Sequence, residues 1–513
     1  MSTRRQFLLQ GAAASLLFTR TGWAAATDAV EVSTPLGRLR GERMASGVRA
    51  FRGVPFAQPP VGDARFRAAL PMKPWSGVRD ATRFGAASLQ PYDRGIAQSE
   101  DCLYLNVWAP ETKQPAPVFV WVHGGGFTGG NSFAPIWEGE QFAQAGIVCI
   151  TVAYRLGALG FLDVSSLLGK EYEGSANHGL GDVVAALEWV QQNIAAFGGD
   201  PTRVTLGGES AGAKLTDLLL GSDAPASLFS QAISESGGAD RTWTSADAAT
   251  FAQAYGKLWT DKTGTPVTAM KTADARQLID VQDSIEKSYP RHFPFRSELA
   301  APLFKRWPLQ AMRAGTSAGP KKQRRLLLGT NRDESALFLG PHPEKPITSA
   351  NLGNVPLDVF KPIEQRYAEL YPDMPADLRR IRSVTAEEYW IPSLRVADAH
   401  VQAGGTAFVY RFDFPASGHF AGETPHASDL GYVWNHLGGA KEGNEAARAM
   451  AVQMHAAWAS FILGHEPAAP GLPAWPRYNL QTRPTMLLNA ESRVENAPLA
   501  PEFALWNGLL EQR

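Results

Sequence analysis

One stretch of the chain restricts the fold more than any other: a short apolar run that ends in small residues around one serine. The run Val204–Leu206 leads into the letters GGESAG at residues 207–212, after which the pattern becomes helical. Gly208, Ser210 and Gly212 match G-x-S-x-G at the point where a strand becomes a helix. A turn this tight strains the serine backbone and leaves no room for side chains at the two glycines. The stretch predicts a Ser210 hydroxyl exposed at the strand tip, as a nucleophile requires, and the alternative is a glycine-rich turn with an incidental serine.

The rest of the chain alternates short apolar runs with helical patterns, which is typical of an α/β protein with a mostly parallel sheet flanked by helices. The segment from about residue 237 to 320 is polar and weakly periodic, so we interpret it as a cap-like insertion over one end of the sheet. Residues 27–513 are expected to form a single domain. We expect a helix over residues 182–194 and strands over residues 117–122, 147–152, 202–206, 326–328 and 407–412.

The N-terminus has the three parts of an export signal in the right order. A twin arginine, Arg4-Arg5, precedes the apolar run Phe7–Phe18 and the small residues Ala24–Ala26. This order resembles a twin-arginine signal peptide, which directs folded proteins out of a bacterial cytoplasm. We therefore expect residues 1–26 to be removed and the protein to be periplasmic or secreted. The alternative is an amphipathic first helix of the domain.

Charge and cysteine content exclude several classes of function. Removal of residues 1–26 takes away three arginines and no acidic residue, so 49 basic against 50 acidic residues become 46 against 50, a net charge of −4. No basic stripe predicts a nucleic-acid partner, and no polybasic patch or further long apolar run predicts a stable membrane anchor. The two cysteines, Cys102 and Cys149, form neither a disulfide framework nor a zinc spacing. We expect no metal and no organic cofactor.

A second glycine-rich segment follows a predicted strand. The apolar run Val118–Val122 leads into His123 and three consecutive glycines, Gly124 to Gly126. The segment resembles the HGGG-type loop of lipases and esterases, in which backbone amides bind an oxyanion. A phosphate-binding loop is the alternative, but the Lys-Ser/Thr pair that such a loop requires does not follow. The amides of Gly125, Gly126 and Ala211 would form an oxyanion hole, where each donor is typically worth ~10²–10³ in turnover.

Several longer motifs, in the expected order over nearly the whole mature chain, resemble the type-B carboxylesterases, the family that also includes the cholinesterases. The resemblance implies the α/β-hydrolase fold, with large insertions that cover the active-site end of the sheet. It also implies hydrolysis of small-molecule carboxylic esters through an acyl-enzyme, with a Ser-His-Glu triad. The motifs are RGVPFAQPPVG at residues 52–62, EDCLYLNV at 100–107, AYRLGALGF at 153–161, FGGDP at 197–201 and WPRY at 475–478.

The predicted acid lies in a loop after the strand at residues 326–328. Asp333 and Glu334 are adjacent there, and either carboxylate could orient a histidine. The resembling family uses the second acid of its Gly-Thr-Asn-x-Asp-Glu-Gly motif, which corresponds to Glu334. This chain has Ser335 where the family usually has glycine.

The predicted base lies after the strand at residues 407–412, where both His419 and His426 follow. Residues 425–434, PHASDLGYVW, resemble the family pattern around the catalytic histidine, which favours His426 and leaves His419 as the second choice. In this role His426 would take the proton of Ser210 and later give one to the leaving alcohol. His123 precedes Ser210 in the chain, so we interpret it as a residue that organises the glycine loop.

Departures from the family pattern are also informative. Ser88 stands where relatives carry the disulfide partner of Cys102, so Cys102 should be a free thiol. The tryptophan that binds quaternary ammonium in cholinesterases has no clear counterpart, with Tyr92 only a rough candidate, so choline esters are unexpected substrates. Ser236 matches a serine near the family's triad. Lys214 stands four residues after Ser210, where relatives usually carry a small or apolar residue.

Lys214 is the open question of the motif. We hypothesise that it reaches a buried acid on the same segment, Glu209 or Asp217, and the alternative is a solvated position.

Two other functions compete with the carboxylesterase prediction. The same catalytic groups could act on a polyester, a lactone, a toxin ester or an amide, or the chain could be a binding module of the same fold without catalysis.

Overall fold

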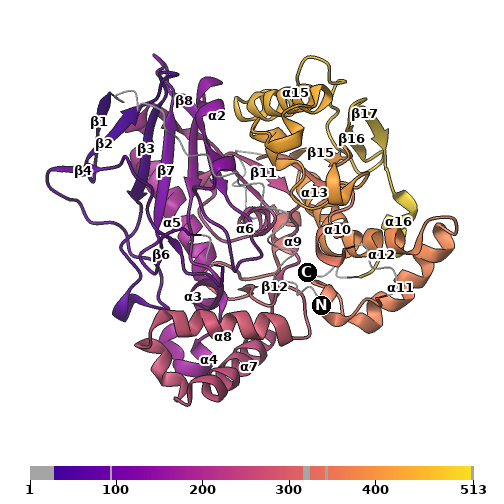
Figure 1. Ribbon diagram of the computed structural model, residues 1–513, viewed down its shortest axis with the longest axis horizontal. Helices are drawn as coiled ribbons and strands as arrows, with labels where there is room; N and C mark the ends of the chain where they lie inside the picture. Colours follow the sequence, from indigo (N-terminus) through magenta and orange to yellow (C-terminus); the bar gives the residue numbers. More distant parts are fainter. Residues whose placement is uncertain (1–27, 93–94, 316–323, 341–344, 510–513) are drawn as a thin grey trace.

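The computed structural model describes residues 28–92, 95–315, 324–340 and 345–509, and one large sheet with helices on both faces runs through the molecule (Figure 1). The expected signal peptide at residues 1–26 lies outside the described residues and stays a prediction. Within the described ranges, no helix is long and apolar enough to cross a membrane.

In this part of the chain, thirteen strands form one mixed sheet, in which the path β1-β2-β3-β7-β9-β8-β10-β11-β14-β15-β16-β17 is hydrogen-bonded in that order and β4 pairs with β2. The central strands from β9 to β16 run parallel, and antiparallel strands extend the sheet on both sides. The strands are β1 (Ala29–Thr34), β2 (Gly37–Arg43), β3 (Arg49–Pro55), β4 (Val78–Asp80), β7 (Tyr104–Ala109), β8 (Ala116–Val122), β9 (Val148–Val152), β10 (Gly199–Glu209), β11 (Gln231–Glu235), β14 (Arg325–Asn331), β15 (Thr406–Phe412), β16 (Pro484–Leu488) and β17 (Arg493–Asn496).

Two further sheets have only two short strands each, β5 (Ala87–Ser88) with β6 (Gln98–Ser99) and β12 (Thr242–Trp243) with β13 (Ser297–Glu298). The described α-helices are α2 (Glu140–Gln144), α3 (Gly157–Phe161), α4 (Ser165–Leu168), α5 (His178–Asn193), α6 (Ala211–Leu220), α7 (Ser245–Thr263), α8 (Ala275–Ser288), α9 (Pro308–Arg313), α10 (Ala336–Leu339), α11 (Leu357–Leu370), α12 (Ala376–Thr385), α13 (Ile391–Gln402), α14 (Leu430–Val433), α15 (Glu445–Ile462) and α16 (Ala500–Leu505). A π-helical turn at Ala386–Trp390 joins α12 to α13.

The central strand β8 shows how the sheet divides the core in two. Successive side chains of a strand point to opposite faces. Val118, Val120 and Val122 accordingly pack into one apolar cluster with α5, α6 and α13, whereas Phe119 and Trp121 pack into another with α2, α14 and α15. All five side chains are fully buried. The near-continuous apolar run that predicted this strand therefore reflects burial on both faces.

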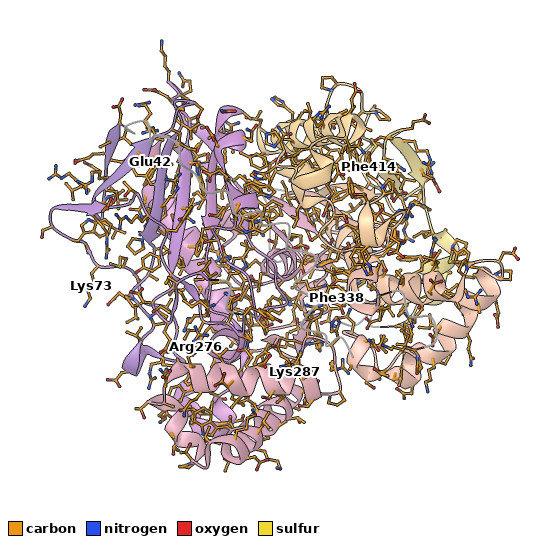
Figure 2. All side chains as sticks on the ribbon, viewed as in Figure 1. Glu42, Lys73, Arg276, Lys287, Phe338 and Phe414 are labelled. Carbon is orange, nitrogen blue, oxygen red and sulfur yellow. The ribbon has the colours of Figure 1, made fainter. Side chains whose placement is uncertain are left out.

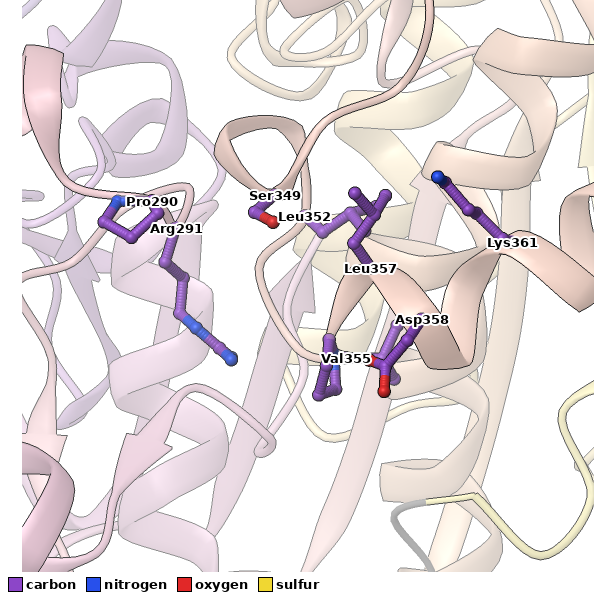
Figure 3. A pocket seen from close by; sticks show the side chains of 9 residues that line it. Pro290, Arg291, Ser349, Leu352, Val355, Leu357, Asp358 and Lys361 are labelled. Atoms are coloured by element: carbon purple, nitrogen blue, oxygen red, sulfur yellow. The ribbon is translucent and has the colours of Figure 1, made fainter.

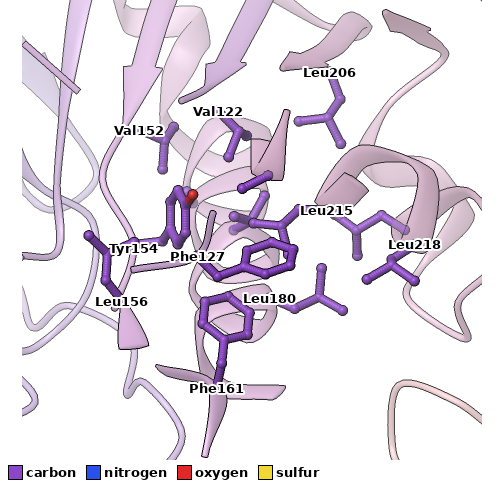
Figure 4. Close-up of a cluster of buried hydrophobic side chains, with 14 of the residues drawn as sticks. Val122, Phe127, Val152, Tyr154, Leu156, Phe161, Leu180, Leu206, Leu215 and Leu218 are labelled. Atoms are coloured by element: carbon purple, nitrogen blue, oxygen red, sulfur yellow. The ribbon is translucent and has the colours of Figure 1, made fainter. Parts of the chain in front are cut away.

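The first of these clusters packs directly beneath the turn that carries Ser210. Leu215 and Leu218 of α6 face Leu206 of β10 and Leu180 of α5 (Figure 4). Side chains fill the space between the ribbons throughout the molecule (Figure 2). Phe414 is buried, while Lys73 is exposed at the left margin of this view. The nucleophile helix is thus fixed by its apolar face against the sheet.

Parallel strands with carboxyl ends at one edge bring the predicted site together. The strands β8, β10, β11, β14 and β15 are consecutive neighbours in the sheet. Each is followed by a segment that carries one predicted residue or loop: Gly124–Gly126, Ser210, Ser236, Glu334 and His426. Ligands of open α/β sheets typically bind at such an edge.

Most sequence-based boundaries agree with the structure within a few residues, with two informative exceptions. The strand expected over residues 202–206 extends to Gly199–Glu209, because Gly207 and Gly208 pair with β8 on one side and β11 on the other. The segment expected to be weakly periodic contains the long helices α7 and α8 (Figure 1). The side chain of Thr244 caps α7, a local signal that the polar composition obscured. The assignment of residues 237–320 as a cap, and of residues 27–513 as one domain, stays a prediction.

Candidate functional site

The turn between β10 and α6 holds Ser210 in a strained conformation, with φ 54° and ψ −117°. A non-glycine residue in such a sparsely populated region costs ~1–3 kcal/mol. The Ser210 amide donates to the carbonyl of Glu235 on β11 at 2.8 Å, which fixes the turn against the neighbouring strand. The expected strain is confirmed, but the expectation of an exposed serine is wrong in degree. Ser210 is only 5% exposed because the glycine loop after β8 packs against it.

The two glycines of the motif are sterically required. A Cβ on Gly212 would lie 1.9 Å from the carbonyl oxygen of Val122, and a Cβ on Gly208 would lie 2.7 Å from the same oxygen. Both distances are shorter than any ordinary van der Waals contact with backbone. The close approach of α6 to β8 therefore excludes side chains at both positions, as the sequence predicted.

The glycine loop lies directly beside the turn. A Cβ on Gly124 would lie 2.4 Å from Glu209 Oε2 and 3.0 Å from Ser210 Cβ. Gly125 and Gly126 have φ values of 120° and 65°, which favour glycine. Among the described residues, no hydrogen bond engages the amides of Gly125 and Gly126. The loop thus presents backbone donors next to Ser210.

His123 organises this loop, as the sequence predicted. Its ring stacks on Tyr154 with 4.6 Å between centroids, and its Nδ1 lies 2.8 Å from the carbonyl oxygen of Gly124. Burial lowers the pKa of His123 to about 4, so the imidazole is neutral at physiological pH. Tyr92 packs against the far end of the loop at Gly129.

Glu334 and His426 meet at the carboxyl edge of the sheet, although 92 residues separate them. His426 Nδ1 lies 2.5 Å from Glu334 Oε2, and the His426 amide donates to the Glu334 carbonyl at 3.2 Å. Burial lowers the pKa of His426, but the nearby carboxylates of Glu209, Glu334 and Asp429 more than offset this effect and raise it above its usual value. The imidazole is therefore held by charge and by backbone.

The competing sequence candidates lie elsewhere. Asp333 accepts hydrogen bonds from Arg332 Nε at 2.8 Å and from the Thr424 amide at 3.0 Å, so its carboxylate secures a neighbouring loop. His419 lies on the short 3₁₀ turn Gly418–Phe420, where its ring packs against Phe420. The structure thus pairs His426 with Glu334 and assigns Asp333 to other contacts.

Further donors fix the Glu334 carboxylate. Ser236 Oγ donates to Glu334 Oε1 at 2.5 Å, and the amide of Asn331 donates to the same oxygen at 2.6 Å. Ser236 follows β11 and itself has a positive φ of 59°. The sequence had marked Ser236 as a residue near the site, and this contact confirms that position. Asn331 was missed, although it belongs to the same motif as Glu334.

Glu209 is the second residue that sequence reasoning did not place in the site. Its Oε1 lies 3.1 Å from His426 Nε2, on the side of the imidazole opposite Glu334. Burial raises the pKa of Glu209 to about 8, and the His426 charge partly opposes that rise. The available signal was its place directly before Ser210, which fixes its carboxyl group at the turn.

The hypothesis about Lys214 was wrong about its partner. Lys214 is buried rather than solvated, and its ion pair is with Glu388, at 3.5 Å from Nζ to Oε1. Asp217 instead accepts from Ser234 Oγ and from the Gly238 amide. Asp217 and Glu209 still interact with Lys214 electrostatically, but the ion pair is made by the acid on the π-helical turn.

A pocket of about 440 Å³ lies between Arg291 and α11, and Ser210, Glu334 and His426 are not among the residues that line it (Figure 3). Arg291 borders it on one side, and Leu357 and Lys361 of α11 border it on the other.

Cys102 and Cys149 are free and buried in the core. Within the described ranges, no group of three or more His, Cys, Asp or Glu residues could hold a metal ion.

Comparisons with known proteins agree with this architecture. The model of the carboxylesterase family matches residues 28–506. The para-nitrobenzyl esterase of Bacillus subtilis (strain 168) is 34% identical over 486 residues, covering 91% of this chain and 96% of that protein. The fumonisin B1 esterase of Sphingopyxis macrogoltabida is 34% identical over 464 residues, covering 85% of this chain and 83% of that protein.

Solved structures give the same result. A PNB esterase structure superposes with a TM-score of 0.81 at 33% identity, over 93% of this chain and 99% of that one. A carboxylesterase structure from Geobacillus stearothermophilus superposes with a TM-score of 0.81 at 32% identity, over the same shares of the two chains. These similarities confirm the expected α/β-hydrolase fold. The chain belongs to the carboxylesterase family and is a carboxylic ester hydrolase.

Proposed function

We propose that this protein hydrolyses small-molecule carboxylic esters in two steps, with Ser210 as nucleophile, His426 as base and Glu334 as the acid that orients it. The observation that carries the proposal is the position of His426. Its Nδ1 contacts Glu334 at 2.5 Å, while its Nε2 faces Glu209, the residue next to Ser210 in the turn. One side of the imidazole is thereby held by a carboxylate, and the other side is directed to the nucleophile turn.

In the first step, Ser210 Oγ attacks the acyl carbon and its proton passes to His426. The raised pKa of His426 suits this transfer, because a more basic imidazole accepts the proton more readily. The ester C–O bond then breaks, and His426 gives the proton to the leaving alcohol. Glu334 orients the imidazole and stabilises the imidazolium.

In the second step, water attacks the acyl-Ser210 ester, again with proton transfer to His426, and the carboxylic acid leaves as Ser210 regains its proton. Both tetrahedral intermediates carry a negative oxygen. The amides of Gly125, Gly126 and Ala211 would donate to it, since the glycine loop lies against Ser210 and Ala211 begins α6. The positive end of the α6 dipole adds to this stabilisation.

Ser210→Ala tests the proposal, with p-nitrophenyl acetate as substrate. Removal of the nucleophile should lower kcat by ~10⁴-fold or more, as it does in other serine hydrolases. Ser284→Ala on α8 is the matched control, because the one hydrogen bond of the Ser284 hydroxyl in the described part of the chain goes to the exposed carbonyl of Asp280. Equal rates for Ser210→Ala and the wild type would refute the triad and favour a binding module that hydrolyses no ester at this serine.

The natural acyl bond is a separate question. The relatives bear the names para-nitrobenzyl esterase and fumonisin B1 esterase, so para-nitrobenzyl esters and fumonisin B1 both belong in a substrate panel. The panel would vary acyl length and alcohol size and add a lactone, a polyester oligomer and an anilide. A rate at least ~10-fold higher on one of these three than on simple esters, or about 1.4 kcal/mol of transition-state binding, would favour that specialisation.

A further inference from the structure

Lys214 occupies a buried position one helical turn after Ser210, where its amide donates to the Ser210 carbonyl at 2.9 Å. Burial lowers the pKa of Lys214 well below its usual value. A buried ammonium group is destabilising unless polar groups surround it. Its partners therefore show what the side chain is holding.

Lys214 Nζ joins two segments that are distant in sequence. It donates to the carbonyl of Gly237 at 2.8 Å and to the carbonyl of Glu388 at 3.2 Å. Gly237 directly follows Ser236, the serine that donates to Glu334. The contact thus connects the nucleophile helix to the turn that fixes the acid.

The other segment is the π-helical turn Ala386–Trp390, which is buried throughout. The Glu388 carboxylate pairs with both Lys214 and Arg241, and no exposed surface reaches this ion cluster. π-Helical turns are rare and frequently occur at functional sites. Lys214 holds this π-helical turn through the backbone carbonyl and the side-chain carboxylate of Glu388.

Tyr389 brings the turn into contact with the site. Its ring lies 4.8 Å from the His426 ring at an interplanar angle of 36°, and Lys214 Nζ lies 4.9 Å from the Tyr389 ring centroid. The Phe338 ring stacks on the Tyr389 ring and also packs against the His426 ring, with 5.3 Å between the centroids of Phe338 and His426. Among the described residues, the Tyr389 hydroxyl has no hydrogen-bond partner. The aromatic ring is therefore the part of Tyr389 that contacts the base.

We propose that Lys214 is a positioning residue: it holds the π-helical turn against the nucleophile helix, so that the Tyr389 ring keeps the His426 imidazole aligned between Glu334 and Ser210. This inference rests on the proposed triad. Lys214 touches no reacting atom and acts through Tyr389. Its loss should change turnover more than substrate binding, because imidazole alignment matters most in the transition state.

The experiment compares Lys214→Met, Tyr389→Leu and the double variant by kcat and KM on p-nitrophenyl acetate. Diethyl p-nitrophenyl phosphate titrates the competent active sites, so kcat is expressed per site and misfolded protein does not count. We expect each single variant to lower kcat by ~10- to 100-fold, the range that a ~1 Å misplacement produces, with KM changed less than about threefold. The kcat of the double variant should stay within about twofold of the kcat of Tyr389→Leu, because both changes break the same connection.

Two controls complete the design. Lys257→Met removes an exposed lysine of α7 whose only ion pair within the described residues is with Asp261, and it should retain wild-type kcat. Tyr389→Phe keeps the ring and should recover most of the turnover that Tyr389→Leu loses. Tyr389→Leu leaves the Lys214 ion cluster in place, so it tests the same connection if Lys214→Met yields no titratable protein.

The proposal is overturned if either single variant keeps kcat within twofold of the wild type, or if the two losses multiply in the double variant. A rise in KM alone would also overturn it. Ser210→Ala distinguishes these failures from a failure of the proposed function. If Ser210→Ala is inactive while Lys214→Met is normal, the triad stands and only the role of Lys214 is refuted.

Discussion

A Gly212→Ala substitution tests whether the close approach of α6 to β8 sets the position of the nucleophile. The added Cβ would lie 1.9 Å from the carbonyl oxygen of Val122, 2.6 Å from its carbonyl carbon and 2.8 Å from the carbonyl oxygen of His123. All three atoms belong to backbone, so no side-chain rotation can relieve the contacts. The helix and the strand must separate instead.

The magnitude follows from two opposing effects. Alanine in place of glycine within a helix stabilises it by about 1 kcal/mol. Overpacking of a tight interior contact destabilises by ~1–3 kcal/mol and occasionally by more, and a 1.9 Å approach to backbone belongs at the upper end. We expect a net loss of about 2 kcal/mol in the free energy of unfolding. A shift of ~1 Å between Ser210 and the glycine loop should also lower kcat by ~10²-fold.

Gly181→Ala on α5 provides the matched control, since a Cβ there meets nothing within 4 Å. Urea unfolding and kcat on p-nitrophenyl acetate would be measured for both variants. The control should be as stable as the wild type or up to about 1 kcal/mol more stable, with normal turnover. If Gly212→Ala matched the control in both measurements, the steric reasoning about this motif would be refuted.

Three further outcomes are expected. Glu209→Gln should move the acid limb of kcat/KM to lower pH, because ionised Glu209, present above its pKa of about 8, raises the pKa of His426. Only neutral imidazole accepts the serine proton, so an unmoved limb in the pH–rate profile would contradict this. Ser236→Ala removes one donor to the buried Glu334 and should lower the free energy of unfolding, measured by urea titration, by ~1–3 kcal/mol. An unchanged midpoint of the urea transition would contradict this. Cys102 and Cys149 are buried with raised pKa values, to about 12 for Cys102, so Ellman's reagent should detect two thiols only after denaturation, and reaction in the native protein would contradict their burial.

The sequence was most informative where local sterics decide the structure. Gly208, Ser210 and Gly212 predicted a strained strand-to-helix turn, because only that geometry needs small residues at both flanking positions. Local sequence could not choose between Asp333 and Glu334, since adjacent acids in one turn differ only in direction. Their partners decide it: Ser236, which follows β11, and Asn331 of β14 donate to Glu334, whereas Asp333 pairs with Arg332.

Lys214 marks the limit of sequence reasoning. The acids close to it in sequence, Glu209 and Asp217, were the suggested partners, and Asp217, three residues on, shares its helix face. The observed partner, Glu388, is 174 residues away and reaches the helix through the π-helical turn. The packing of α13 and the π-helical turn against the sheet brings Glu388 to Lys214. A buried lysine in a small-residue motif is visible in sequence, but the charge that neutralises it is not.

The site's strain is balanced by hydrogen bonds between neighbouring strands, and this explains why the parallel sheet is needed. Ser210 and Ser236 both have positive φ, at ~1–3 kcal/mol each. The Ser210 amide donates to Glu235 at the end of the next strand, and the Ser236 amide donates to Gly329 on the strand after that, both at 2.8 Å. Each strained residue is therefore bonded to the strand that delivers the next part of the site. Because this chain of contacts follows the register of adjacent strands, a shift of one strand would misplace the nucleophile and the acid together.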